Sequence, residues 1–333
     1  MSDALASTIS GLEQFLGARW DTPVRVTDAH AASAGARRLN LLFTARRDGE
    51  AERLVATIVP TAALQITAID VEAAHLRMAE AAGVPVPHVI ASSSDGAEVG
   101  GPFIISTAIE GETVPRRVLR LVAATPDLGP ELGRQCGAAL AHLHAADLAD
   151  CHPDIPRPAP DANPAETTLV RLREQLDELL TPSAAFELGY RRLLDAIPDD
   201  DRVTPVHNDF RNGNLIIGPD GLRAVLDWEA SGIGAPMSDL AWMCVRMWRF
   251  GNDHLPVGGF ATVEDLRAGY ERAGGRWDDA AFRWWMVLGS LRWGIGLGGQ
   301  VRQHIEGEFR SIVMAGSGRR IAEMEYDVLS LLA

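Results

Sequence analysis

The sequence predicts an α+β protein of two lobes, a small antiparallel β-rich lobe followed by a large, mostly helical lobe. Short apolar runs separated by turn residues dominate residues 24–60 and 88–109, whereas apolar residues at helical spacing dominate the chain after residue 111. The length of 333 residues suits one large domain or two smaller lobes. We therefore expect lobes of residues 1–108 and 109–333.

The elements of the first lobe follow from periodicity and from turn residues. Residues 4–16 have the pattern of an amphipathic helix, and a second helix ends at Gly83, just before two prolines. Glycine and aspartate mark the turns between the strands, and residues 32–38 are expected to form a turn of small residues. The predicted second helix covers residues 68–82, and the predicted strands cover residues 39–45, 53–59, 88–92 and 102–109.

The second lobe is predicted to be helical except for one loop and one hairpin. The loop covers residues 152–164, which are rich in Pro and Asp. The hairpin pairs residues 215–217 with 222–226 around a Gly-Pro-Asp-Gly turn. Glycines between residues 289 and 299 indicate close packing or a kink in a helix. The predicted helices cover residues 132–144, 166–180, 184–197, 240–250, 263–273, 279–297 and 319–332.

Composition excludes several classes of protein. The net charge of −14 argues against binding to nucleic acid or to an anionic membrane surface. The three cysteines, Cys136, Cys151 and Cys244, have neither metal-binding nor disulfide spacing, which fits a reducing compartment. No apolar run reaches membrane-spanning length, and the first residues lack the pattern of a signal peptide. We expect a cytoplasmic protein, monomeric or homodimeric.

The most informative pattern is H-x-D-x-x-x-x-N at residues 207–214, followed by an Asp at 227. In kinase chemistry the Asp of such a loop accepts the proton of the attacking hydroxyl, while the Asn and the later Asp bind Mg²⁺. Mg²⁺ prefers octahedral oxygen coordination with one or two carboxylates plus phosphate oxygens. The predicted hairpin would bring Asn214 and Asp227 together for this purpose. The competing interpretation is that these residues are ordinary turn and capping residues.

These motifs resemble those of the protein-kinase-like fold, and within it of the aminoglycoside phosphotransferase and choline kinase superfamily. The resemblance is carried by the loop at 207–214, by Leu-Asp-Trp-Glu at 226–229 and by Met-Ser-Asp-Leu-Ala at 237–241, and it covers residues 30–250. Protein kinases have Asp-Phe-Gly where this chain has Asp-Trp-Glu. The chain looks closest to bacterial phosphotransferases related to the kinase-like domains that accompany some acyl-CoA dehydrogenases.

The resemblance implies roles for the residues of the helical lobe. Asp209 would be the catalytic base, and Asn214 and Asp227 would be the Mg²⁺ ligands. His207 would support the loop, although a purely structural histidine is an equal alternative. Asp239 would hold the backbone of the loop from a neighbouring helix, or would serve simply as a helix N-cap.

The resemblance also implies a nucleotide site in the first lobe. The turn from Ser33 through Gly35 and Arg37 would cover the phosphates, because glycine lets backbone N–H groups approach an anion. Thr107 and Ile109 fall where backbone groups of the segment between the lobes would bind a purine. ATP or GTP would be the co-substrate.

One departure from the family pattern concerns the cation that usually contacts the α- and β-phosphates. Thr57 occupies its place on the third strand, and the chain contains no lysine. Losing this contact would cost about 1.5–3 kcal/mol. Either Arg37, Arg38 or Arg53 reaches the site, or nucleotide binding is weak, or the lobe binds something else. Glu72 matches the residue that pairs with this cation in the family; without its usual partner, an ordinary residue on the helix surface is an equal alternative.

The sequence contains fewer features that indicate the chemical class of the phosphoryl acceptor. Tryptophans are frequent after residue 241, and most are expected in the core, although some could line an apolar pocket. Arg283 and Arg292 could pair with an anionic group or lie at the surface. An aminoglycoside would need several carboxylates, which the acidic stretches 150–161 and 199–201 could supply.

These observations favour a Mg²⁺-dependent transfer of the γ-phosphoryl group of ATP or GTP to a hydroxyl group held at Asp209. An apolar or acyl-type hydroxyl compound is the preferred acceptor, and an aminoglycoside-type antibiotic kinase is the alternative. The missing strand cation leaves open a catalytically impaired, kinase-like binding protein. A metal-dependent hydrolase that uses Asp209, Asp227 and His207 would leave the hairpin and the Asp-Leu-Ala string unexplained.

Overall fold

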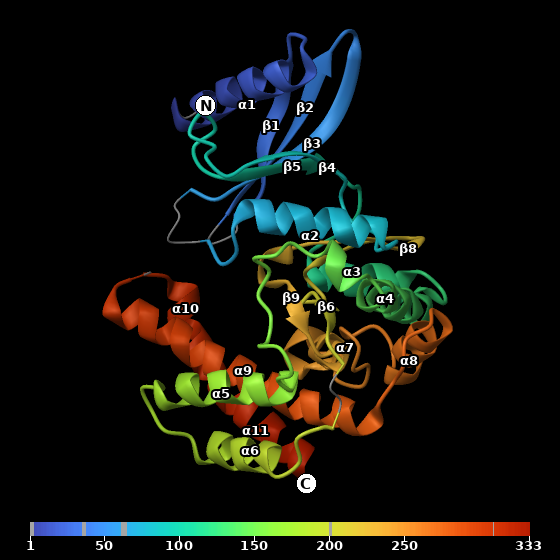
Figure 1. Ribbon diagram of the computed structural model, residues 1–333, viewed down its shortest axis with the longest axis vertical. Helices are drawn as coiled ribbons and strands as arrows, with labels where there is room; N and C mark the ends of the chain where they lie inside the picture. Colours follow the sequence, from blue (N-terminus) through green and yellow to red (C-terminus); the bar gives the residue numbers. More distant parts are fainter. Residues whose placement is uncertain (1–2, 35–37, 61–64, 200–201, 309) are drawn as a thin grey trace.

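The computed structural model describes residues 3–34, 38–60, 65–199, 202–308 and 310–333. An antiparallel sheet lies at one end of the molecule and a large group of helices at the other (Figure 1). The predicted bilobal α+β fold is confirmed.

The five strands of the first lobe form one antiparallel sheet in the order β1-β2-β3-β5-β4. The strands are β1 (Arg25–Ala34), β2 (Leu39–Arg47), β3 (Glu50–Ile58), β4 (Val89–Ser93) and β5 (Phe103–Thr107). The expected turn at residues 32–38 is partly wrong, because residues 32–34 continue β1 and pair with β2. Burial alternates along β3 with the period of two that a half-buried strand requires.

Two helices cover the two faces of this sheet. Leu12 and Leu16 of α1 (Asp3–Trp20) share a core with Phe43 and Leu54 on one face. On the other face, α2 (Ile69–Ala81) packs against β4 and β5 and belongs to the core of the helical lobe. Because α2 contacts both the sheet and the segment after β8, it connects the two lobes (Figure 1).

The second lobe contains helices and two small antiparallel pairs of strands. Two helices not expected from the sequence are α3 and α10, and β6 pairs with β9 in a sheet that was also not expected. The helices are α3 (Pro115–Ala124), α4 (Leu128–His144), α5 (Pro164–Asp177), α6 (Ala184–Leu194), α7 (Pro236–Cys244), α8 (Val263–Arg272), α9 (Asp279–Glu306), α10 (Ile312–Ser317) and α11 (Ile321–Leu332). The strands are β6 (Thr204–Val206), β7 (Leu215–Gly218), β8 (Gly221–Val225) and β9 (Gly232–Gly234).

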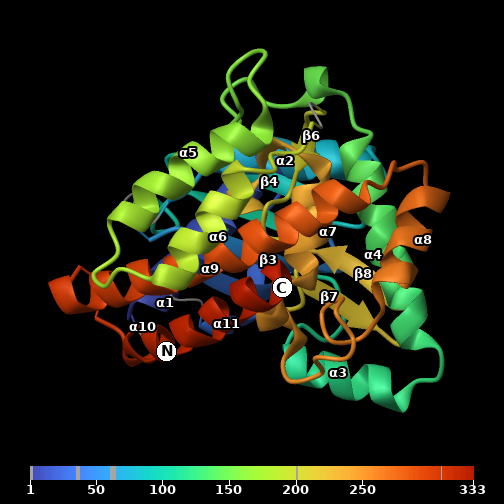
Figure 2. The ribbon, with the colours of Figure 1, turned by 90° about the horizontal axis from the view of Figure 1, so that it is seen from below.

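The long helix α9 organises the helical lobe, where it contacts α7, α6 and α11 (Figure 2). Three of its glycines lie where a Cβ atom would press against a neighbour: Gly289 against Val245, Gly294 against Phe186, and Gly298 against Leu179. The expectation of close packing holds at these positions, and the helix continues through them to residue 306. Small residues therefore allow neighbouring elements to approach α9 closely.

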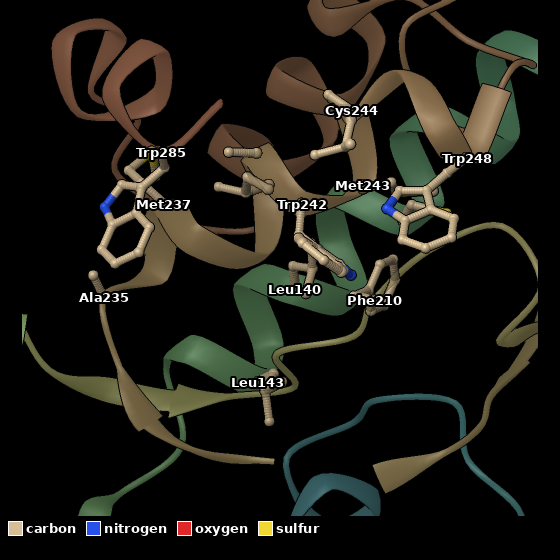
Figure 3. Close-up of a cluster of buried hydrophobic side chains, with 14 of the residues drawn as sticks. Leu140, Leu143, Phe210, Ala235, Met237, Trp242, Met243, Cys244, Trp248 and Trp285 are labelled. Atoms are coloured by element: carbon tan, nitrogen blue, oxygen red, sulfur yellow. The ribbon is translucent and has the colours of Figure 1, made fainter. Parts of the chain in front are cut away.

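The core of the second lobe is rich in tryptophan, as expected. Trp242, Trp248, Trp284 and Trp285 are each less than 7% exposed. Trp242 and Trp248 lie among the buried side chains around α7, to which α4 contributes Leu140 and Leu143 (Figure 3). No helix in the described part of the chain is both long and apolar enough to span a bilayer.

Candidate active site

The loop between β6 and β7 carries the H-x-D-x-x-x-x-N motif, and Asp239 of α7 holds its backbone. One carboxylate oxygen of Asp239 accepts a hydrogen bond from the amide of His207 and the other from the amide of Asn208, both at 2.7 Å. Asn208 has a φ of 63°, which non-glycine residues seldom adopt, so the loop needs this support. Asp239 is not the N-cap of α7, which is Ala235; the capping interpretation was wrong.

The carboxylate of Asp239 is completely buried and has a third partner. Burial alone would raise its pKa, but hydrogen bonds from the His144 ring and the His207 amide lower that pKa below its ordinary value. Nε2 of His144 lies 3.3 Å from Asp239, and Nδ1 lies 3.0 Å from the hydroxyl of Tyr270. Buried hydrogen bonds from His144 of α4, supported by Tyr270 of α8, therefore hold Asp239, which in turn holds the backbone of the loop.

His207 supports the loop from inside. Its Nδ1 accepts a hydrogen bond from the Asp209 amide at 3.2 Å, so its Nε2 is the donor to the carbonyl of Leu226 at 3.0 Å. Its ring packs edge-on against Phe210 and Trp228. His207 therefore ties the loop to the end of β8, as a supporting residue would.

Asp209 lies at the centre of the site, and three N–H groups hold its side chain. Trp242 Nε1 donates to Oδ1 at 2.9 Å, and Asn214 Nδ2 donates to Oδ2 at 2.7 Å. Arg211 Nε lies 3.0 and 3.2 Å from the two oxygens. The Asp209 side chain is still 23% exposed, so a substrate hydroxyl can reach it.

Asn214 and Asp227 approach each other across the hairpin. The amide of Leu226 donates to the carbonyl of Asn214 at 2.8 Å, which places Asp227 one residue from this contact. Because the side-chain nitrogen of Asn214 donates to Asp209, its oxygen is left for another ligand. Asp227 is exposed, has a φ of 66°, and makes no hydrogen bond or ion pair within the described chain. An amide oxygen and an open carboxylate suit a Mg²⁺ ion that also binds phosphates.

Arg38 places a cation beside Glu72, where Thr57 offers none. Its guanidinium donates to both oxygens of Glu72, at 2.8 and 2.9 Å, and lies 2.8 Å from a carboxylate oxygen of Glu229. The side chain of Arg38 is only 9% exposed. The expectation that Glu72 lacks a partner was wrong, because the partner comes from the residue before β2 instead of from β3.

The other residues predicted for the nucleotide site lie partly within and partly outside the described structure. The hydroxyl of Thr57 donates to the side chain of Asn40 at 2.8 Å. Ser33 lies in β1 opposite Asn40, whereas Gly35 and Arg37 lie outside the described residues.

Hydrogen bonds within the first lobe already use two of the backbone amides that were candidates to bind a purine between the lobes. The amides of Thr107 and Ala108 already donate to the carbonyls of His88 and Arg53, so they cannot also bind a purine. Ile109 is the remaining candidate donor there. The side chain of Arg53 lies at the surface, where it pairs with Glu110.

Comparison with known families decides the classification. Residues 28–285 match the phosphotransferase enzyme family. The chain belongs to this family. The prediction that it is a phosphotransferase is thereby confirmed.

Relatives and solved structures agree with this assignment. The chain is 28% identical over 206 residues to acyl-CoA dehydrogenase family member 10 of Mus musculus, covering 58% of this chain and 18% of that protein. It is 30% identical over 222 residues to probable acyl-CoA dehydrogenase IBR3 of Arabidopsis thaliana, covering 62% and 25%. The chain thus spans a quarter or less of these relatives.

Similar folds occur among solved antibiotic phosphotransferases. A Ralstonia eutropha JMP134 protein, solved as a candidate aminoglycoside phosphotransferase, is 23% identical with a TM-score of 0.72 and 97% coverage of both chains. Aminoglycoside 2'-phosphotransferase-IIIa in complex with GDP is 12% identical with a TM-score of 0.64 and 99% coverage of both. At these identities the likeness concerns the fold.

In this chain a cavity of about 250 Å³ lies next to the loop that carries Asp209, although Asp209 itself is not among its described lining residues. Its wall includes Asn208, Trp242 and Arg292, and Trp242 is the residue that donates to Asp209. A molecule in the cavity would therefore lie next to two direct neighbours of Asp209.

Sequence reasoning missed the roles of Arg211 and Trp242. Arg211 follows Asp209 by two residues and Trp242 follows Asp239 by three, but only the folded chain brings both to one carboxylate. The indoles of Trp242, Trp248 and Trp293 pack on one another, with centroids 4.8–6.1 Å apart. Arg211 lies over Trp248, so the cluster also positions this arginine.

Proposed function

We propose that the chain is a Mg²⁺-dependent small-molecule kinase that moves the γ-phosphoryl group of ATP or GTP to a substrate hydroxyl. The observation that carries this proposal is the state of Asp209, whose carboxylate is held by three N–H groups and is still 23% exposed. Asn214 contacts Asp209 directly, and across the hairpin its carbonyl accepts from Leu226, the residue before Asp227, whose carboxylate has no ion pair within the described chain. Family membership supports phosphoryl transfer.

Each residue of the site would have a separate role in an in-line displacement at the γ-phosphorus. Asp209 accepts the hydrogen bond and then the proton of the acceptor hydroxyl, while Arg211 and Trp242 hold its carboxylate in position. The hydroxyl oxygen forms a bond to the γ-phosphorus as the bond to the β-phosphate oxygen breaks. A phosphomonoester and a nucleoside diphosphate are the products. Bound Mg²⁺, held by Asn214 and Asp227, would neutralise charge on the phosphates.

The nucleotide would lie between residues 1–108 and residues 109–333. Arg38 would contact its phosphates beside Glu72, the segment from Ser33 through Gly35 and Arg37 would cover them, and Ile109 would contact the base. Solved relatives in complex with GDP, and with AMP-PNP and hygromycin B, support a nucleotide co-substrate.

The position of Arg38 weakens the case for a non-catalytic binding protein. That alternative rested on the absence of a cation at Thr57. Arg38 restores a buried cation next to Glu72, and the three chemical residues Asp209, Asn214 and Asp227 are all present. An active enzyme, cytoplasmic and either monomeric or homodimeric, is therefore the proposal.

The acceptor is proposed to be an apolar or acyl-type hydroxyl compound instead of an aminoglycoside. Leu172, Ile233, Trp285 and Leu288 supply apolar surface to the cavity, and none of its described lining residues is acidic. A polycationic aminoglycoside would need carboxylates there. The acidic stretch at 150–161 contributes Pro156, Arg157 and Pro158 to the lining, but none of its aspartates.

Thermal unfolding with ATP, GTP or ADP, with and without Mg²⁺, tests the nucleotide site. A ligand at a hundred times its Kd stabilises the native state by about 2.7 kcal/mol. We expect a Mg²⁺-dependent rise in Tm in the wild type, its loss in Asp227→Ala, and its retention in the control Asp195→Ala, which alters an exposed carboxylate at the end of α6. No shift with any nucleotide at millimolar concentration would refute the proposal.

A further inference from the structure

The cavity beside Asp209 carries positive charge in a protein whose net charge is −14. Arg157, Arg171 and Arg292 line it, and among its described lining residues there is no Asp or Glu. A concave site lined by one sign of charge concentrates ligands of the opposite sign. The charge of the cavity lining is therefore opposite in sign to the net charge of the protein.

Arg292, on α9, is the innermost of the three arginines. It is half-buried, and its guanidinium lies over the indole of Trp242, 4.6 Å from the ring centroid. Its hydrogen bond in the described structure goes to the carbonyl of Asn208, at 3.5 Å, and no carboxylate of the described residues lies within ion-pair distance. Burial lowers the pKa of Arg292 and the charges of Asp209 and Asp239 oppose this, but with no carboxylate in direct contact its guanidinium can still bind an anion.

Arg157 and Arg171 stand at the exposed side of the same cavity. Arg157 donates to the carbonyls of His152 and Pro153, at 3.2 and 3.4 Å, which holds its side chain against the loop. Arg171 projects from α5 and makes no ion pair within the described part of the chain. Both guanidinium groups thus keep donors for an incoming molecule.

The cavity also offers apolar surface between these arginines and Asp209. Leu172 of α5 and Trp285 and Leu288 of α9 are buried core residues that line it. At about 250 Å³ the cavity falls below the usual size of pockets for drug-sized ligands, so its occupant is small.

We propose that the acceptor is a small hydroxylated organic anion with an apolar stem, whose anionic group binds the arginines of this cavity. This inference rests on the proposed kinase function. The hydroxyl of the acceptor would lie at Asp209, its stem along Leu172 and Trp285, and its carboxylate or phosphate at Arg171 and Arg157. A polycation would meet the like charges of three arginines in a lining whose described residues include no Asp or Glu.

Binding without nucleotide tests the proposal, because no phosphoryl transfer can then occur. The probes are 8-hydroxyoctanoate, its neutral methyl ester, the cationic 8-amino-1-octanol and the monophosphate ester of 1,8-octanediol, each titrated calorimetrically into the wild-type protein. We expect at least one anion to bind about tenfold or more tightly than the methyl ester, and the amine to bind most weakly. If the phosphate ester binds more tightly than 8-hydroxyoctanoate, the anionic group of the acceptor is a phosphate. If 8-hydroxyoctanoate binds more tightly, the group is a carboxylate.

Two exposed arginines on helices provide a matched pair of variants. Arg171→Glu should weaken binding of the preferred anion about tenfold or more and leave the methyl ester within about twofold. The control Arg192→Glu makes the same change of charge on α6, away from the cavity lining, and should leave both affinities unchanged. Equal affinity for anions and ester, or equal effects of the two variants, would overturn the proposal.

The titrations of the cavity and the thermal unfolding with nucleotides can give different answers, so the two proposals can fail independently. If anions bind as expected but no nucleotide raises the Tm, the cavity proposal stands and the kinase proposal fails. If nucleotides bind and the cavity prefers the amine or the ester, the kinase proposal stands and the anionic acceptor is rejected.

Discussion

Arg38 and Glu72 form a bidentate ion pair, with two N–H···O contacts of 2.8 and 2.9 Å. Arg38 precedes the second strand of the sheet, and Glu72 lies in the helix that joins the lobes. The same guanidinium also reaches Glu229, directly after the Trp of the hairpin motif, at 2.8 Å. Its buried Nε has no partner in the described structure. One side chain thus ties together the sheet, α2 and the candidate metal-binding hairpin.

The first prediction concerns this arginine. Arg38→Lys keeps a positive charge but cannot donate through a planar fork, so we expect the affinity for ADP with Mg²⁺ to fall about tenfold or more. Arg38→Ala should lower this affinity further, and it leaves Glu72 buried without its ion-pair partner, which costs about 3–5 kcal/mol of stability. Isothermal titration at a temperature where each variant is folded measures the affinity.

Arg53→Ala is the control for this prediction. Arg53 lies on the strand where the family cation would be sought, but its side chain is 54% exposed and pairs with Glu110 at the surface. The ADP affinity of Arg53→Ala should stay within about twofold of the wild type, because an exposed ion pair contributes little. If instead Arg53→Ala loses affinity while Arg38→Lys keeps it, the site cation has been assigned to the wrong arginine.

The catalytic loop and the lobes could be predicted from the sequence because their signals are local. The spacing from His207 to Asn214 and the strand-turn-strand pattern before Asp227 depend on neighbours in the chain. Arg38 could be named only as one of three candidates, because its contact with Glu72 spans 34 residues and depends on how α2 packs. Local patterns carry no information on such contacts.

The ends of the helices also depend on contacts between distant residues, which local sequence patterns do not reveal. The helix α3 is a different case, because its apolar residues recur at helical spacing and the local signal was sufficient to predict it. The helix α9 continues past residue 297 because Gly294 and Gly298 fit against Phe186 and Leu179, and a propensity argument penalises glycine without knowing these neighbours. The cavity likewise unites residues from α5, α7, α9 and two loops, which no spacing rule could reveal.

The second prediction concerns Trp242. Trp242→Phe keeps an aromatic ring in the cluster but removes the N–H that donates to Asp209, so we expect kcat to fall about tenfold, the effect of one lost hydrogen bond to a charged group. The control is Trp248→Phe in the same cluster, 5.5 Å away by ring centroids, whose indole nitrogen has no partner in the described structure. Its kcat should change less than about threefold. Equal losses in the two variants would show that only packing matters.

The third prediction concerns Asp239. In Asp239→Asn one of the two loop amides loses its acceptor, so the free energy of unfolding should fall by about 1–3 kcal/mol and kcat should fall as the loop loosens. Asp278→Asn, at the N-cap of α9, is the control and should be nearly neutral, because Asn and Asp cap helices equally well. Chemical denaturation and steady-state kinetics measure the two effects.

The pH dependence of Asp239 is predicted from the direction of its pKa. Because folding lowers the pKa of this carboxyl, its contribution to stability is complete above its unfolded value of about 3.9 and is lost only as the pH falls through the lower folded value. The difference in stability between the wild type and Asp239→Asn should therefore be constant from pH 7 to pH 5. A difference that shrinks within this range would contradict the assignment.

The fourth prediction concerns His75, a fully buried histidine of α2 whose two ring nitrogens have no hydrogen-bond partner in the described structure. Burial, together with the nearby charges of His207 and His152, lowers its pKa from 6.5 to about 4. Between these values the unfolded chain binds a proton that the folded chain does not, so stability falls as the pH is lowered. From pH 7 to pH 5 this residue should remove about 2 kcal/mol from the free energy of unfolding.

Urea denaturation at pH 7, 6 and 5 measures this slope in the wild type, in His75→Leu and in the control His254→Leu. The control removes an exposed histidine and should keep the wild-type slope. The slope of His75→Leu should be smaller by about 2 kcal/mol over this interval, whatever its stability at pH 7, because only the difference in proton binding is compared. Identical slopes in all three proteins would mean that His75 takes up a proton as readily in the folded state as in the unfolded state.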